Sequence, residues 1–395
     1  MSQFTVRRAQ EADLERLIAI HQNAFPDGRS LASRRLNFVQ NTRFHPDDLF
    51  VIEEGEHLLG HAFYAITDGW FGGKRLRVAM IASLGTAPEA RDSGVATALL
   101  THLHARSDQA GASLDLLYPF AQSFYHRFGY ESVSPYVRLA AHPLAFPAGQ
   151  RATLQPITGD DAAQIMALYE RFCGERTGML DRSDERWERI WTDDASTQLC
   201  LRTGNQVTAY VSFSLHQAFL HGPTKLLIHD WAWADGKSQR ALWNWARSLA
   251  GQAIVIEVDV CRNDPLLDAV RDSEHGRFGD PAVEHPIGTL AAGPSIRIVQ
   301  LTRALAARGY RSKETLTFAV GAERFTIHDG SLRQAASDAA VEATISPQGI
   351  VQLAFGGVAA EALLAMGRLE GISAEAIART ERIFSCAPYF SPDVF

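Results

Sequence analysis

Apolar and polar positions along the first part of the chain alternate between the period of a strand and the period of a helix. Residues 4–9 have the pattern of a short strand, and Leu14 and Ile18 then belong to an apolar stripe at helical spacing. Residues 49–66 hold two apolar runs around a polar Glu-Gly-Glu centre, which predicts a hairpin. Residues 76–86 form one more apolar run and predict a long strand. The pattern therefore predicts an α/β unit.

The same order of patterns returns further along the chain. Residues 152–172 repeat the strand and helix, residues 198–214 repeat the hairpin, and residues 226–234 repeat the long strand. Asp161 stands in the second pattern where Asp13 stands in the first. Two copies of one α/β unit are therefore predicted. The second copy continues as DGKSQRALWNW and lacks the R-x-x-G-x-A pattern that follows the long strand of the first copy.

From about residue 291 the pattern changes to short strands and an alanine-rich helix. Residues 315–327 predict a hairpin, residues 343–355 predict a strand pair, and residues 358–366 predict a short helix. This third region is expected to be a small α+β unit. The pattern thus divides the chain into three predicted domains, residues 1–150, 151–290 and 291–395.

The composition of the 395-residue chain narrows the possible functions. Its net charge of −7 includes no block of like charge, which argues against a sequence-independent nucleic-acid binder. The four cysteines lie far apart and predict neither a zinc site nor a disulfide framework. Residues 350–367 are interrupted by Gln352 and Glu361 and do not predict a membrane span, and the N-terminus lacks the apolar core of a secretory signal. We expect a soluble, cytoplasmic protein without a metal, a nucleic-acid partner or a membrane partner.

A glycine-bearing turn follows the long strand of the first unit. Residues 91–97 read RDSGVAT, in which Gly94 directly precedes an apolar helical pattern. A glycine lets the backbone approach a ligand closely, and the free N–H groups at a helix start attract an anion. Arg91 adds a charge that can pair with phosphate. The turn therefore predicts a phosphate-bearing cofactor, with an ordinary strand-to-helix connection as the alternative; it fits neither the P-loop nor the dinucleotide-binding pattern.

The strand that ends at Thr86, together with residues 88–96, resembles the acyl-CoA loop of the GNAT N-acetyltransferase superfamily, whose pattern is R/Q-x-x-G-x-G/A. Residues 117–131 resemble the end of the catalytic domain in the Eis-like branch, and residues 294–305 resemble the entry to that branch's sterol-carrier-like domain. Residues 353–371 and the ending APYFSPDVF match in order and spacing. The resemblance implies an α/β (α+β) fold with tandem GNAT domains, the second degenerate, each a mixed central sheet flanked by helices, and a third sterol-carrier-like domain.

Acetyl-CoA is the co-substrate that the resemblance implies. The loop amides would hold its pyrophosphate, and the preceding strand would bind its pantetheine arm. Asp92 departs from the family pattern because it places a carboxylate beside the expected pyrophosphate, and we expect its side chain to point outward. The residues that the resemblance assigns to cofactor binding are Leu84, Gly85, Thr86, Arg91, Asp92, Ser93, Gly94, Val95, Ala96, Thr97, Phe120 and Ala121.

Acyl transfer to an amine needs a proton donor for the departing thiolate and a proton acceptor for the amine. The resemblance assigns the donor role to Tyr125 in FYHRFGY, with Tyr130 as the competing candidate and core packing as the alternative for Tyr125. It assigns the acceptor role to the terminal carboxylate of Phe395, although chain ends are commonly loose. The prolines and aromatic residues near the end favour a docked tail. Asp27 is a further candidate for contact with a cationic substrate.

The predicted function is acetyl-CoA-dependent N-acetyl transfer to a primary amine. The acceptor is either a small cationic molecule, aminoglycoside-like or a polyamine, or a lysine side chain. The alternative is a non-catalytic carrier that binds an apolar ligand in the sterol-carrier-like domain. The resemblance also implies a homo-oligomer, namely a hexamer of two trimers.

Overall fold

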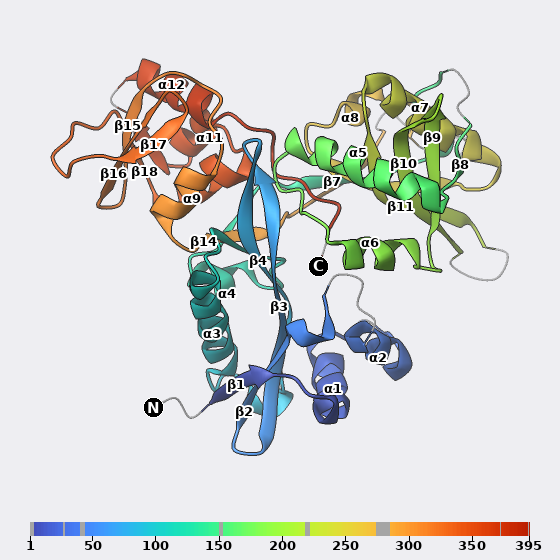
Figure 1. The fold of residues 1–395 in the computed structure, drawn as a ribbon, viewed down its shortest axis with the longest axis horizontal. Coiled ribbons are helices and arrows are strands. Elements are labelled where there is room, and N and C mark those ends of the chain that lie inside the picture. Colours follow the sequence, from blue (N-terminus) through green and yellow to red (C-terminus); the bar gives the residue numbers. More distant parts are fainter. Residues whose placement is uncertain are drawn as a thin grey trace.

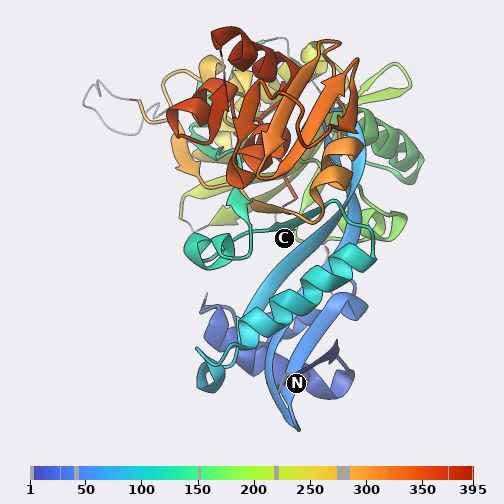
Figure 2. The same ribbon diagram turned by 90° about the vertical axis from the view of Figure 1, so that its left-hand side faces the viewer.

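The computed structural model describes residues 4–26, 28–39, 44–149, 153–217, 222–273, 285–371, 373–393 and 395, so that Asp27 lies outside the described residues. It has three lobes, each built on its own sheet (Figure 1). The C-terminus lies between the lobes in this view and again in the view turned by 90° (Figure 2). The predicted mixed α/β fold is confirmed.

The first lobe is a seven-stranded sheet in the order β1-β2-β3-β4-β5-β14-β6, in which only β4 and β5 pair in parallel. The long β3–β4 hairpin turns at Gly72 and Gly73, whose positive φ values (+58° and +80°) suit a two-residue hairpin turn. The strands are β1 (Thr5–Arg8), β2 (Leu49–Glu54), β3 (His57–Phe71), β4 (Lys74–Thr86), β5 (Leu114–Leu117), β6 (Glu131–Ser132) and β14 (Ser295–Ile298), and the helices are α1 (Leu14–Ala24), α2 (Leu31–Val39), α3 (Val95–Gln109) and α4 (Gln122–His126).

The second lobe repeats this arrangement in a sheet of order β13-β7-β12-β11-β10-β9-β8, in which only β11 and β12 pair in parallel. The predicted repeat of one α/β unit is therefore seen in the strand pairing. The strands are β7 (Tyr136–Ala141), β8 (Gln155–Pro156), β9 (Thr197–Thr203), β10 (Gln206–Gln217), β11 (Thr224–Trp233), β12 (Val255–Cys261) and β13 (Gly288–Ala291), and the helices are α5 (Ala162–Gly174), α6 (Asp184–Trp191), α7 (Gly236–Arg247) and α8 (Pro265–Ala269).

In both lobes the parallel pair separates after a few residues. The pairing of β4 with β5 ends at Met80 and Leu116, although β4 continues to Thr86. The pairing of β11 with β12 ends at Ile228 and Val258, although β11 continues to Trp233 and β12 to Cys261. We call the two wedges between the diverging strands the first splay and the second splay.

The first two lobes exchange strands. β7 lies within the predicted range 1–150 but pairs with β12 and β13 of the second sheet. β14 lies within the predicted range 291–395 but pairs with β5 and β6 of the first sheet. The predicted boundaries stay a prediction. β7 directly precedes the other strands of its sheet in sequence, whereas β14 joins the first sheet from a distant part of the chain.

The third lobe is a five-stranded sheet of order β17-β16-β15-β18-β19. The predicted strand pair over residues 343–355 is wrong after Ile345, because Ser346 caps a helix through the amide of Gly349 and Pro347 takes its first position. The strands are β15 (Leu316–Val320), β16 (Glu323–His328), β17 (Ser331–Gln334), β18 (Ala343–Ile345) and β19 (Leu369–Gly371), and the helices are α9 (Leu301–Ala307), α10 (Pro347–Val351), a π-helical turn (Gln352–Gly356), α11 (Ala360–Ala365) and α12 (Ala374–Phe384).

The apolar core of the first lobe continues into the third. Phe71 at the end of β3 packs against Phe355 of the π-helical turn and against Tyr389 near the chain end, at ring distances of 5.7 and 6.2 Å. The second lobe has a separate core. The third lobe is therefore fixed to the first through buried side chains. Among the described helices, none has both the length and the apolar character that crossing a membrane requires.

Candidate active site

A cavity of about 670 Å³ lies at the loop that joins β4 to α3, and we call it the loop cavity. Its walls come from the end of β4, the loop, the first turn of α3, the end of α1 and the segment around α4. Ser93 and Ala121 do not line it; the hydroxyl of Ser93 instead donates to the carbonyl of Ala90. The other residues predicted to bind the cofactor do line it, namely Leu84, Gly85, Thr86, Arg91, Asp92, Gly94, Val95, Ala96, Thr97 and Phe120.

The loop leaves backbone N–H groups open at the start of α3. Gly94 is the N-cap residue at φ +88°, a conformation that favours glycine, and it offers no side chain to cap the helix. The amide of Ala98 is the one that bonds back to the Gly94 carbonyl. The amides of Val95, Ala96 and Thr97 therefore have no acceptor within the helix. Together with the helix dipole they form a site for an anion such as a phosphate.

Two charged residues lie on the exposed rim of the loop. Asp92 has a φ of +61°, a left-handed conformation that aspartate tolerates better than most residues. The guanidinium of Arg91 donates to the carbonyl of Asn23 over 3.3 Å, which ties the loop to the end of α1. Both residues line the loop cavity, so a cation and a carboxylate stand at its entrance. The outward orientation expected for the Asp92 carboxylate stays a prediction.

β4 has a bulge where it leaves β5. Its register with β3 shifts between His61 and Phe63, and Ser83 has a φ of +49°. A Cβ on Gly85 would lie 2.9 Å from Nε2 of His61, so that only glycine fits there. Burial lowers the pKa of His61 to about 3, with a further contribution from His21, and the imidazole behind the bulge is neutral. The sequence did not reveal Ser83, because a run that is apolar on both faces has no alternation for a bulge to interrupt.

A smaller cavity of about 50 Å³, here called the inner cavity, adjoins the loop cavity. The two share Phe25, Leu84 and Phe120 as lining residues. The diverging parts of β4 and β5 also line the inner cavity, which therefore occupies the first splay. Tyr125 and Phe395 complete its wall. The structure thus brings the two residues predicted to be catalytic to one small cavity next to the predicted cofactor loop.

The two candidate tyrosines have different surroundings. Tyr125 lies on α4 and is only 4% exposed, with its ring edge-on to Phe120 and Phe124. Burial raises the pKa of its hydroxyl above the ordinary value, so that it stays protonated at neutral pH. The hydroxyl of Tyr130 lies 3.1 Å from Nε2 of His104, and this residue lines neither cavity. Of the two, Tyr125 is the one that lines a cavity beside the predicted cofactor loop.

The described residues near the end of the chain are docked rather than loose. The amide of Tyr389 donates to the carbonyl of Gly356, and the amide of Phe390 donates to the carbonyl of Thr177. The ring of Phe395 lies edge-on to Tyr118 at 5.4 Å. The tail therefore runs from the third lobe, past the second, into the inner cavity of the first.

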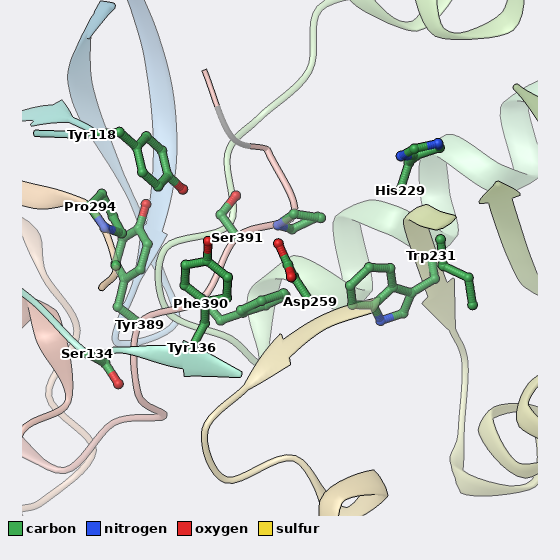
Figure 3. A pocket seen from close by; sticks show the side chains of 13 residues that line it. Tyr118, Ser134, Tyr136, His229, Trp231, Asp259, Pro294, Tyr389, Phe390 and Ser391 are labelled. Atoms are coloured by element: carbon green, nitrogen blue, oxygen red, sulfur yellow. The ribbon is translucent and has the colours of Figure 1, made fainter. Parts of the chain in front are cut away.

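A third cavity, of about 160 Å³, lies beside the tail and is here called the tail cavity (Figure 3). Residues of the tail bound it on one side, and Asp259 and Trp231 of the second lobe bound it on the other. Tyr118 lines both this cavity and the inner cavity. The buried hydroxyl of Tyr389 also belongs to its wall and has no hydrogen-bond partner among the described residues. A molecule in the tail cavity would therefore find a polar group to bind.

Comparisons with known proteins match a protein-family model to each of the three lobes. A family model described as an acetyltransferase (GNAT) domain matches residues 5–133, and a second model of the same description matches residues 178–292. A model for a sterol carrier protein domain matches residues 301–391. A search of curated proteins found no match.

Two solved structures share the fold over almost the whole chain, and a third shares it over three quarters of the chain. A GCN5-related N-acetyltransferase from Anabaena variabilis is 20% identical, with a TM-score of 0.84 over 99% of this chain and 100% of that one. Eis1 from Mycobacterium abscessus is 19% identical, with a TM-score of 0.76 over 99% and 100% of the two chains. An N-myristoyltransferase from Saccharomyces cerevisiae with bound myristoyl-CoA is 12% identical, with a TM-score of 0.51 over 75% of this chain and 79% of that one. The chain belongs to the GNAT superfamily of acetyltransferases, as an enzyme with two GNAT domains followed by a sterol carrier protein domain.

Proposed function

We propose that this enzyme transfers an acetyl group from acetyl-CoA to a primary amine of a small cationic molecule or of a lysine side chain. One observation carries the proposal: the loop cavity and the inner cavity meet at Leu84 and Phe120. An anion-binding loop, a protonated tyrosine and the chain's terminal residue are thereby gathered from three separate parts of the sequence.

The loop cavity supports binding of the donor. The open amides of Val95, Ala96 and Thr97 suit a pyrophosphate, and Arg91 adds a positive charge at the rim. The diverging edge of β4 offers backbone groups of Leu84 to Thr86 that β5 does not pair. These residues bind and orient the donor without taking part in the chemical step.

The size of the inner cavity favours an acetyl group. In this measure one water molecule needs about 10–15 Å³, so a volume of about 50 Å³ holds a group of only a few heavy atoms. A two-carbon acyl group fits such a space, whereas a long chain needs a longer channel. We therefore assign acetyl-CoA as the preferred donor.

Two groups of this chain suit the proton transfers. The amine must lose a proton to become a nucleophile, and the carboxylate of Phe395 at the inner cavity is the group assigned to accept it, directly or through a water molecule. The hydroxyl of Tyr125 is assigned to protonate the departing sulfur. Burial raises the pKa of this hydroxyl, and the same desolvation makes a thiolate in that cavity a stronger base. The proton therefore moves to the sulfur as negative charge develops there.

The tail cavity supports an acceptor that extends beyond its reacting amine. Because Tyr118 lines both cavities, a molecule whose amine enters the inner cavity has room for its remaining part beside the tail. The aromatic rings of Trp231 and Tyr136 suit an alkylammonium group, and Asp259 carries a carboxylate that Arg138 holds with two hydrogen bonds of 2.9 Å. The two rings favour a cationic acceptor, whereas the charge of Asp259 is already balanced by Arg138.

The test measures thiol release from acetyl-CoA with a panel of aminoglycosides, polyamines and lysine peptides. Tyr125→Phe keeps the ring contacts and removes the proton, and we expect kcat to fall about 100-fold with KM for acetyl-CoA unchanged. One glycine added after Phe395 moves the carboxylate and should also lower kcat.

The proposal fails if no amine is acetylated and calorimetry detects no binding of acetyl-CoA, an outcome that would favour a carrier of apolar ligands instead. Full turnover by Tyr125→Phe would remove that residue from the mechanism. The proposed assembly is a hexamer, and light scattering of the purified protein measures its mass.

A further inference from the structure

The second lobe has the same strand splay as the first, but its contents differ. The ring of Phe390 packs on Trp231 of β11 at 5.9 Å, and the thiol of Cys261 in β12 lies 3.7 Å from the carbonyl of Pro388. Both diverging strands of the second splay therefore contact the tail. In the second lobe the chain's own C-terminal segment takes the position that the inner cavity has in the first.

The helix after the second splay is closed to an anion. Asp235 is the N-cap residue of α7, and its carboxylate accepts a 2.7 Å hydrogen bond from the amide of Ser238. That hydrogen bond lowers the pKa of Asp235, so the helix start already holds a negative charge. The equivalent position in the first lobe is Gly94, which has no side chain. A phosphate is thus attracted to the first helix and repelled from the second.

A buried cluster of charges joins the tail to the second lobe. Arg182 donates to both oxygens of Asp230 at 2.6 and 3.0 Å and to Asp393 at 3.0 Å. Arg186 donates to the same oxygen of Asp393 at 2.8 Å. The hydroxyl of Tyr169 lies 3.2 Å from its other oxygen. We call Arg182, Arg186, Asp230 and Asp393 the tail clamp.

The tail clamp sets position more than it adds stability. Its two arginines and two aspartates balance in charge, and the side chains of Arg182 and Asp393 are only 2% and 8% exposed. Burying such ions costs about as much as their attraction returns, so apolar residues would stabilise the fold equally well. Charged partners, however, fix the register of the tail, because a shift of the tail by one residue would leave Arg186 buried and unpaired.

The clamp lies within reach of the active site. Asp393 precedes Phe395 by two residues, and two residues span at most about 7 Å. The terminal carboxylate is therefore confined to a small region around the point where the clamp holds Asp393. That region includes the inner cavity, which Phe395 lines together with Tyr125.

We propose that Arg182 and Arg186 are positioning residues for the active site of the first lobe, and that the second GNAT domain serves as a mount that holds the terminal carboxylate beside Tyr125. The inference rests on the proposed role of that carboxylate in acetyl transfer. The two arginines act through Asp393 and contact no substrate.

The test compares Arg186→Gln, Asp393→Asn and the double variant. Each single change leaves one unbalanced buried charge, whereas the double change restores neutrality, because Arg182 and Asp230 remain paired. We expect the double variant to regain the thermal stability that the single variants lose. Its kcat should nevertheless stay about 100-fold below that of the wild type, as in the single variants, with KM for acetyl-CoA unchanged. Arg202→Gln is the matched control, since its partner Asp161 is an aspartate of the same lobe that holds no tail residue.

A second readout does not depend on turnover. Carboxypeptidase followed by intact-mass measurement should shorten the double variant much faster than the wild type or Arg202→Gln. Equal rates of trimming in the double variant and the wild type would refute the claim that the clamp holds the tail. This outcome can be read even if no acceptor amine is found and the proposed function fails. Faster trimming together with wild-type kcat would show that the clamp holds the tail but does not position a catalytic group, and would overturn the inference.

Discussion

Replacing Gly178 with alanine tests whether the tail is a fitted part of the active site. Gly178 has a φ of +98°, and a Cβ on it would lie 2.5 Å from the ring of Tyr389, which is only 2% exposed. Its amide also bonds to the carbonyl of Trp70 in β3, so the backbone cannot move away without breaking a contact between the first two lobes. The clash therefore falls on Tyr389 and displaces the tail.

A second glycine serves as a control that separates the backbone strain of an alanine from its clash with Tyr389. Gly204, in the β9–β10 turn, also has a positive φ of +60°, but a Cβ there meets nothing within 4 Å. A left-handed residue with a Cβ costs about 1–2 kcal/mol, and this cost applies to both variants. Overpacking adds about 1–3 kcal/mol for Gly178→Ala alone. We therefore expect a loss of roughly 2–5 kcal/mol for Gly178→Ala against about 1–2 kcal/mol for Gly204→Ala.

Urea unfolding followed by tryptophan fluorescence measures both losses, and Trp231 reports on the tail through its contact with Phe390. Gly178→Ala should also lower kcat, whereas Gly204→Ala should not. The reasoning is refuted if the two variants lose equal stability, or if Gly178→Ala keeps full turnover. Either result would mean that the tail tolerates displacement at Tyr389.

Two further predictions concern pH and the acyl donor. Burial lowers the pKa of His104 to about 3, with a contribution from Arg297, so the unfolded chain binds more protons below its own histidine pKa of about 6.5. The free energy of unfolding should fall as pH decreases from about 6.5 towards 3, by up to about 1.4 kcal/mol per pH unit for each such histidine. His104→Gln should therefore flatten the slope of the urea midpoint against pH. An unchanged slope would contradict the lowered pKa of His104. Since the inner cavity holds about 50 Å³, kcat/KM should fall at least about tenfold from acetyl-CoA to butyryl-CoA, and equal use of both would show that the cavity opens further.

The residues predicted for the first lobe's site come from local signals, and most of them line the loop cavity or the inner cavity. The loop around Gly94 combines a glycine, an arginine and an apolar helix start within a few residues, and each has a direct physical meaning. The repeat could be seen because the same alternation of apolar and polar positions occurs twice. The prediction for residues 343–355 is wrong after Ile345 because a buried helix and a buried strand have equally apolar runs; the available signal is Ser346 followed by Pro347, which starts a helix.

What the sequence could not reveal depends on residues far apart in the chain. Arg182 and Asp393 are separated by 211 positions, and neither has a neighbouring residue that marks it as a partner. The exchange of β7 and β14 between the first two sheets is similarly invisible, because a strand's own pattern does not specify which sheet it joins. Only the three-dimensional structure shows that Asp393 of the tail pairs with Arg182 and Arg186 of the second lobe.

The energetic cost of ordering the tail explains why it needs so many contacts. Fixing the backbone of each residue costs about 1–2 kcal/mol, which amounts to the order of 10 kcal/mol for a segment that runs from the third lobe to the inner cavity. Burial of the Tyr389 ring contributes about 1.5–3 kcal/mol, and the half-buried ring of Phe390 contributes less, so the rings alone do not suffice. Backbone hydrogen bonds to Gly356 and Thr177 hold the tail further, and the ion pairs of Asp393 fix which residue stands at the clamp without adding much net stability. For the proposed role of the Phe395 carboxylate, a tail held in this way fixes the position of the carboxylate before any substrate arrives, which is the condition under which a weak base can act on a bound amine.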